Sequence, residues 1–129
     1  MHSTFTTPKI EGEIADYYFE DGILFSLSKS VKRTVENISE NVTLVKKITG
    51  NKPVPLLIYL SKSPVPDKAT RKFSSQMVPE IYSAMAMVSK PGLAQIVMRM
   101  VFAFQNPPIP MKSFSSDKEA LVWLKQYMK

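Results

Sequence analysis

The hydrophobic pattern of the chain begins with two short runs that favour strands. Residues 13–20 and 23–27 are rich in aromatic and branched apolar residues, the types that favour strands. Asp21-Gly22 lies between the two runs. An Asp-Gly pair favours the tight turns of hairpins, because glycine adopts positive φ without steric penalty. This part of the chain therefore predicts an antiparallel β-hairpin.

A helical period follows the hairpin. Apolar residues recur at spacings of three and four, which keeps them on one side of a helix. These residues are Val31, Val35, Ile38, Val42, Val45 and Ile48. Ser30 suits the N-cap, and Gly50 suits the left-handed stop of this helix. Residues 54–60 then form a short, almost wholly apolar run, typical of a strand covered on both faces. A helix between two such strands predicts a crossover and a parallel pair.

A second helix is expected to begin at Asp67 and to run to about Gln76. We favour a buried strand over residues 83–88, where the alanine and methionine content would equally suit a helix. Pro91-Gly92 precede a third helix, residues 93–104, that is apolar on nearly every face. A helix with this composition must be buried on more than one side.

The end of the chain adds one more strand and helix. Residues 106–110 contain three prolines, which cannot continue a helix. Residues 111–114 are expected to form a short edge strand. Ser116-Asp-Lys-Glu119 matches a capping box, in which the first helical amides are satisfied reciprocally, and predicts the start of the last helix.

Composition narrows the possible chemistry. The 129 residues suit one domain, with residues 1–11 as a flexible N-terminus. The chain has no cysteine and a single histidine, His2, which excludes thiolate catalysis, histidine general-base catalysis and nearly every zinc site. The sequence contains no phosphate-binding loop, dinucleotide fingerprint or suitably spaced pair of carboxylates. We therefore expect no enzymatic activity, no metal and no cofactor.

Charge and hydropathy indicate whether the protein binds nucleic acid or enters a membrane. The formal net charge of +6 is spread along the chain without interleaved aromatic residues, which favours solvated helix faces over a nucleic-acid surface. The N-terminus does not resemble a signal peptide, and no apolar run reaches the roughly 18 residues of a membrane helix. We expect a soluble cytoplasmic protein with no integral membrane segment and no nucleic-acid partner.

The first candidate for function is the loop after the apolar strand 54–60. In open α/β sheets, ligand and partner sites gather where strands end. A helix N-terminus with lysines nearby also favours negative charge. The candidate phosphorylation or interaction residues are Ser61, Lys62, Ser63, Asp67 and Thr70. The alternative interpretation is an ordinary solvated turn in which Asp67 caps the helix.

The second candidate combines the apolar third helix with the methionines of the strand before it. Its residues are Met85, Met87, Ile96, Met98, Arg99, Met100 and Phe102. Methionine adapts to irregular apolar surfaces, so this set predicts core, a homodimer interface or a pocket for an apolar ligand. Arg99 must reach solvent, a carboxylate such as Glu80, or a ligand anion.

The predicted order is two strands, a helix, and then strand and helix repeated three times. This order resembles the SpoIIAA-like (STAS) domains and the related bacterial STAS/SEC14-like proteins. Three features carry the resemblance: the Asp21-Gly22 hairpin before an amphipathic helix, the buried strand ending in a loop, and the closing segment 107–124, Pro-Pro-Ile-Pro-Met-Lys-Ser-Phe-Ser-Ser-Asp-Lys-Glu-Ala-Leu-Val-Trp-Leu. The resemblance implies an α/β fold with a mixed sheet of four to five strands, an N-terminal hairpin followed by β–α units, and about four helices.

The resemblance also implies a class of function. Regulatory STAS domains are phosphorylated on a serine after the central strand, usually in an Asp-Ser-Ser-Gly-like turn. Here the loop reads Ser61-Lys-Ser-Pro-Val-Pro-Asp-Lys-Ala-Thr70 and lacks that turn. We expect a non-enzymatic regulatory or protein-interaction module, phospho-regulated at this loop, with an unknown protein partner and a homodimeric state. The alternative is a SEC14-like carrier of a lipid or small apolar ligand under the second and third predicted helices.

Overall fold

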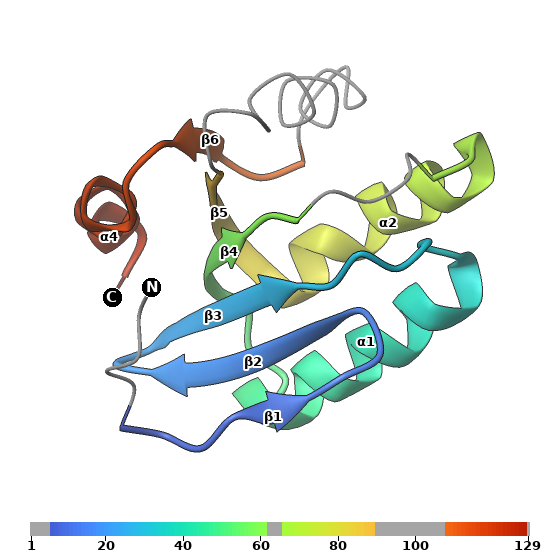
Figure 1. The fold of residues 1–129 in the computed structure, drawn as a ribbon, viewed down its shortest axis with the longest axis horizontal. Coiled ribbons are helices and arrows are strands. Elements are labelled where there is room, and N and C mark those ends of the chain that lie inside the picture. The colour runs from blue at the N-terminus through green and yellow to red at the C-terminus, as the bar shows by residue number, and fades with distance from the viewer. Residues whose placement is uncertain (1–5, 62–65, 90–107, 129) are drawn as a thin grey trace.

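The structure, a computed structural model, describes residues 6–61, 66–89 and 108–128 (Figure 1). The described residues form one six-stranded mixed sheet in the order β1-β2-β3-β4-β5-β6. The strands are β1 (Ile10–Glu11), β2 (Ala15–Glu20), β3 (Ile23–Ser28), β4 (Val54–Tyr59), β5 (Tyr82–Val88) and β6 (Met111–Phe114). The pairs β1–β2 and β2–β3 are antiparallel, and β3 to β6 are parallel. This is the predicted α/β architecture of a hairpin followed by parallel strands, with one strand more than the four to five expected.

The helices of the described residues are α1 (Val35–Thr49), α2 (Lys68–Ile81) and α4 (Asp117–Leu124). A 3-10 turn, Lys125–Tyr127, follows α4. The predicted third helix, residues 93–104, lies outside the described residues. The last helix begins as expected, because Ser116 is its N-cap and accepts a hydrogen bond from the Glu119 amide.

The predicted hairpin is confirmed. Asp21 and Gly22 have φ of 54° and 79°, the left-handed conformation that a primed turn requires at both central positions. The additional strand is β1, within the segment expected to be a flexible N-terminus. Ile10 lies opposite Tyr17 of β2, so β1 extends the hairpin on its outer side.

The start of α1 corrects a prediction. Ser30 is not the N-cap, because the helix begins four residues later with Thr34 as its cap. Thr34 accepts a hydrogen bond from the Asn37 amide, and the Asn37 side chain accepts one from the Thr34 amide. Val31 therefore precedes the helix, although it still packs against the core. The left-handed Gly50, with φ of 69°, ends α1 as predicted.

The end of α2 was also predicted wrongly. The helix begins at the Asp67 cap as expected but continues past Gln76 to Ile81. It passes through Pro79, whose side chain is exposed. Val78 and Ile81 are buried in the core, and this packing favours the last turn of helix despite the proline. β5 then begins directly at Tyr82, which confirms a strand over residues 83–88.

The helices lie on both faces of the sheet, as Figure 1 shows. α1 and α2 cover one face, where Val45 and Val78 pack against Leu24 and Leu56. α4 covers the other face, where Ala120 and Leu124 pack with a second cluster from the strands. That cluster consists of Ile23, Phe25, Leu57, Ala84 and Ala86. Because β3 to β6 are parallel, their carboxyl ends meet at one edge of the sheet, from which α1, α2 and α4 start.

Candidate functional site

The candidate site lies at this edge, which we call the carboxyl edge. It consists of residues 28–34 between β3 and α1, residues 59–61 and 66–72 between β4 and the first turns of α2, and residues 114–117 between β6 and α4. Partner and ligand sites of open α/β sheets gather at this position. The predicted loop of Ser61, Asp67 and Thr70 belongs to the carboxyl edge.

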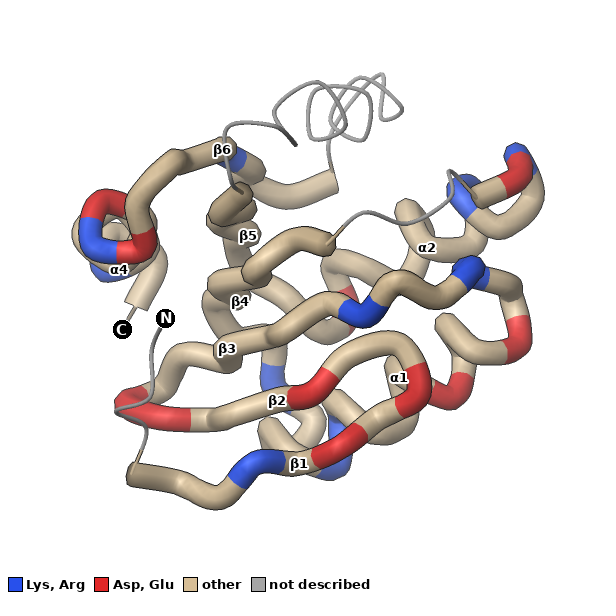
Figure 2. The backbone as a smooth tube through the Cα atoms, in the orientation of Figure 1, with Lys and Arg blue, Asp and Glu red and all other residues tan. Residues whose placement is uncertain are grey.

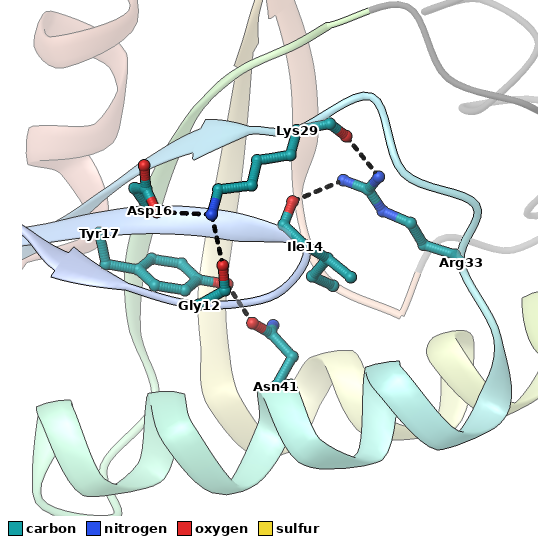
Figure 3. Close-up of polar contacts among 7 residues, drawn as sticks. All are labelled: Gly12, Ile14, Asp16, Tyr17, Lys29, Arg33 and Asn41. Carbon is teal, nitrogen blue, oxygen red and sulfur yellow. Dashed lines mark hydrogen bonds and ion pairs between the residues drawn. The ribbon is translucent and has the colours of Figure 1, made fainter.

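Arg33 joins two segments of the chain at the carboxyl edge, the β1–β2 turn and the residues after β3 (Figure 3). Its Nη1 donates to the carbonyl oxygens of Lys29 at 2.6 Å and Val31 at 2.5 Å. Its Nη2 donates to the carbonyl oxygen of Ile14 at 3.1 Å and to Ser28 Oγ at 2.7 Å. We call this set of bonds the Arg33 clamp. The clamp fixes residues 29–33 in a non-helical path, which explains why α1 begins only at Val35, with Thr34 as its cap.

The charge of Arg33 has no carboxylate partner within the clamp, since its acceptors there are carbonyl and hydroxyl oxygens. Partial burial lowers the pKa of Arg33, because desolvation disfavours the charged form. The guanidinium nevertheless stays protonated at neutral pH. The clamp therefore adds positive charge to the carboxyl edge.

Lys29 forms a second link between the same segments. Its Nζ donates to the Gly12 carbonyl oxygen at 2.6 Å and lies 3.0 Å from Asp16 Oδ1 (Figure 3). The turn between β1 and β2 is closed further by a hydrogen bond from the Gly12 amide to the Ala15 carbonyl oxygen. This ion pair and the clamp attach the β1–β2 turn to the segment after β3.

The start of α2 is organised around Asp67. Its Oδ1 accepts a hydrogen bond from the Thr70 amide at 2.8 Å. Arg71 donates from Nη1 to the Pro66 carbonyl oxygen at 2.6 Å, which ties the residue before the cap to the helix. Hydrogen bonds from Thr70, together with the charges of Lys32 and Arg71, lower the pKa of the exposed Asp67 carboxyl. Asp67 is therefore the cap that the sequence predicted.

The three hydroxyl candidates of the loop differ in accessibility. Thr70 is only 3% exposed, on the inner side of α2. Ser61 Oγ, directly after β4, is buried without a hydrogen-bond partner. Ser63 and Lys62 lie outside the described residues. In this conformation neither Ser61 nor Thr70 presents its hydroxyl to an external kinase.

A further polar contact joins β4 to the start of α4. Tyr59 donates from its hydroxyl to Asp117 Oδ2 at 3.1 Å. Burial and the neighbouring Asp117 carboxylate raise the pKa of Tyr59 well above its ordinary value. Tyr59 is therefore a neutral hydrogen-bond donor that attaches α4 to the carboxyl edge.

The second set of predicted residues is only partly described. Met87 is 2% exposed, and Met85 packs against the core between the sheet and the helices α1 and α2. Both methionines therefore belong to the core, one of the predicted alternatives. Ile96, Met98, Arg99, Met100 and Phe102 lie outside the described residues.

Charge is distributed unevenly over the fold. Figure 2 shows lysines and arginines on the β3–α1 connection and at the start of α2, whereas β1 and β2 carry several acidic residues. No three histidine, aspartate or glutamate side chains gather to hold a metal ion in the described part of the chain. None of the helices described is long and apolar enough to span a membrane.

Sequence reasoning interpreted Lys29, Lys32 and Arg33 as part of a solvated helix face and did not assign them to a site. The acceptors of Lys29 and Arg33 are mainly backbone carbonyls on other segments, which no side-chain motif marks. The available signal was their clustering directly after a predicted strand, where a connection at the carboxyl edge must lie.

Comparison with known proteins identifies the family and the fold. No curated protein matches the sequence. The chain is similar to an uncharacterized protein of the DUF3478 family from Shewanella loihica PV-4, whose crystal structure at 2.25 Å resolution has a SpoIIAA-like fold. The two are 15% identical, with 92% of this chain and 98% of that chain covered and a TM-score of 0.60. This similarity shows the fold alone, and it confirms the SpoIIAA-like architecture. The model of a domain of unknown function, DUF7793, matches residues 17–128, and the chain belongs to that family.

Proposed function

We propose that this chain is a non-enzymatic protein-interaction module that presents its carboxyl edge to a partner protein. The observation that carries the proposal is that, at two of the three connections there, an arginine holds described residues by hydrogen bonds to backbone carbonyls. Arg33 holds the segment between β3 and α1, and Arg71 holds Pro66 at the start of α2.

Fixed connections favour recognition for an entropic reason. A loop that is ordered before binding loses less conformational freedom when the partner arrives. Binding residues are also found preferentially on loops that a rigid scaffold positions. Two side chains at this edge have a structural role: Asp67, one of the predicted candidates, caps α2, and Tyr59 bonds to Asp117 of α4.

We propose further that phosphorylation regulates the binding of the partner at this edge, with Ser63 as the site. The hydroxyls of Ser61 and Thr70 are buried, so a kinase would reach them only after local opening. Phosphate mapped to Ser63 in protein purified from its own host would support this form. If neither Ser63 nor its neighbours carry phosphate, phospho-regulation is refuted, and the interaction module remains as the proposed function.

Site-specific photo-crosslinking in the host cell tests the interaction surface. A benzophenone side chain at Ala69, exposed on the first turn of α2, probes the carboxyl edge. The same group at Val122, 64% exposed on α4, is the matched control on the opposite face. We expect a protein adduct from position 69 and none from position 122. An adduct with a second copy of the chain would identify the expected homodimer.

Native mass spectrometry of the unmodified protein tests the carrier alternative. A monomer that retains a lipid-sized mass and gives no adduct at position 69 would refute the interaction module and favour the carrier alternative. A protein adduct at position 122 alone would place the interaction surface on α4 and refute the assignment to the carboxyl edge.

A further inference from the structure

We infer that the partner segment bound at the carboxyl edge is acidic, and that Lys32, Lys68, Arg71 and Lys72 recognise it. These four residues are called the basic patch below. The inference rests on the proposed function, since it names the chemistry of the partner at the same surface.

The basic patch brings together cations from two separate segments. Lys32 lies between β3 and α1, whereas Lys68, Arg71 and Lys72 lie on the first turns of α2. Figure 2 shows both groups at the same end of the molecule. Lys32 and Arg71 also both act on the Asp67 carboxylate, which places the two segments within electrostatic range of each other.

The lysines of the basic patch are available for a partner. Lys32, Lys68 and Lys72 are exposed, and their side-chain amines form no ion pair or hydrogen bond with the residues that the structure describes. By contrast, Lys29 is paired with Asp16, and Lys46 is paired with Glu80. Four cations that share a single carboxylate, Asp67, leave a net positive potential that attracts an anionic segment.

Asp67 shows which anion the basic patch accommodates. The charges of Lys32 and Arg71 both lower the pKa of its carboxyl, and its Oδ1 accepts a hydrogen bond from the Thr70 amide. Cations from both segments therefore already act on one carboxylate of this chain. Further aspartate or glutamate side chains on a partner would pair with the lysines that remain.

The distribution of aromatic rings favours a protein partner over a nucleic acid. Single-stranded nucleic acids bind where basic residues are combined with aromatic side chains on which bases stack. The aromatic residues of the carboxyl edge, Tyr59 and Phe114, pack into the cluster on the α4 face of the sheet, where Trp123 and Tyr127 also lie, and not among the basic patch. Phe73, the aromatic residue of α2, packs against the core.

Fluorescence anisotropy on the full chain tests the inference. The probe is a labelled peptide of alternating glutamate and serine, and the reference probe has glutamine in place of glutamate. The patch variant carries Lys32→Ala, Lys68→Ala and Lys72→Ala. The control variant carries Lys9→Ala, Lys47→Ala and Lys125→Ala, three exposed lysines elsewhere, so both variants have the same net charge.

We expect the wild type to prefer the glutamate peptide and the patch variant to bind it about tenfold more weakly, which corresponds to about 1.4 kcal/mol. The control variant should lose less than about twofold, because isolated exposed charges contribute little. Added salt should weaken the wild-type complex, because it screens exposed charges. Circular dichroism of both variants verifies that the substitutions leave the fold intact.

Three results would overturn the inference: equal binding of both peptides, equal weakening in both variants, or tighter patch-dependent binding of a single-stranded oligonucleotide. The crosslinking experiment separates this failure from failure of the proposed function. If the Ala69 adduct forms but the acidic peptide does not bind, the surface is correct and its partner is not acidic. If no adduct forms either, both proposals fail.

Discussion

Replacing Arg33 with methionine removes the donor that joins the β1–β2 turn to the segment after β3. Methionine keeps an unbranched apolar stem but provides no N–H group. Two of the four acceptors retain another hydrogen bond: the Ile14 carbonyl accepts the Lys29 amide at 2.9 Å, and the Lys29 carbonyl accepts the Val31 amide at 2.8 Å. The Val31 carbonyl and Ser28 Oγ lose the donor that Arg33 supplies.

These two acceptors determine the size of the effect. A buried acceptor left without a partner costs about 1–3 kcal/mol, and half-buried groups such as these belong at the lower end, because water reaches them. We therefore expect the free energy of unfolding to fall by about 2 kcal/mol. With an unfolding entropy of about 0.27 kcal/mol/K for 129 residues, the melting temperature should fall by about 7 °C.

Denaturant unfolding followed by tryptophan fluorescence measures this change. Trp123 is the only tryptophan, and it packs between Phe114 and Tyr127, so its emission reports loss of tertiary structure. Lys32→Met is the matched control, because Lys32 is the exposed neighbour of Arg33 and should change stability by less than about 0.5 kcal/mol. If Arg33→Met is as stable as this control, the clamp does not hold the carboxyl edge.

Three further substitutions or conditions test other parts of the fold by the same unfolding assay. Gly12→Ala should destabilise by about 1–3 kcal/mol, because a Cβ there would lie 2.8 Å from the Ala15 carbonyl oxygen; a neutral result would show that the turn relaxes freely. Leu124→Ala should cost about 2–5 kcal/mol, because Leu124 is 0% exposed beneath α4; a loss under about 1 kcal/mol would contradict that packing. Burial raises the pKa of both Tyr17 and Tyr82, so above pH of about 10 the unfolded state loses these protons first. The free energy of unfolding should then fall by up to about 1.4 kcal/mol per pH unit for each tyrosine. Tyr82→Phe should reduce this slope; an unchanged slope would show that Tyr82 does not cause the pH dependence.

Local patterns were sufficient where an element depends on its own residues. The Asp21-Gly22 turn, the stripe through Ile38, Val42 and Val45, and the cap at Asp67 are each confirmed at the predicted positions. β1 could not be predicted in this way, because a two-residue strand has no period. It forms through its pairing with β2.

The two wrong helix boundaries have tertiary causes. Ser30 has the chemistry of an N-cap, but the Arg33 clamp occupies the Val31 carbonyl, which lies in the first turn that such a helix would have formed. Gln76 was a plausible end because Pro79 follows soon after, yet Val78 and Ile81 gain burial only if the helix continues. In both cases contacts with distant residues override local propensity.

The sequence predicted where the candidate site lies in the fold, but it did not predict the burial and contacts of the residues there. The described ends of the loop after the apolar strand, Ser61 and residues 66–67, lie at the carboxyl edge, and Asp67 has the role of cap that was weighed for it. The burial of Ser61 and Thr70 depends on how α2 packs against the sheet, which no loop motif reveals. The two segments of the basic patch lie at the same edge because β3 and β4, the strands before them, are parallel neighbours.

The choice between arginine and lysine at the carboxyl edge follows from what each must do. A guanidinium is a planar fork of donors, so Arg33 can bond four oxygens at once, whereas an ammonium is a compact, strongly hydrated charge. Carbonyl oxygens orient the Arg33 guanidinium but do not neutralise it, so the clamp also contributes to the positive potential around Lys32. Removing Arg33 should therefore weaken both the fold and the binding of an acidic segment, whereas removing Lys32 should weaken binding alone. Comparison of the two variants therefore distinguishes the contribution of rigidity from the contribution of charge to binding at this edge.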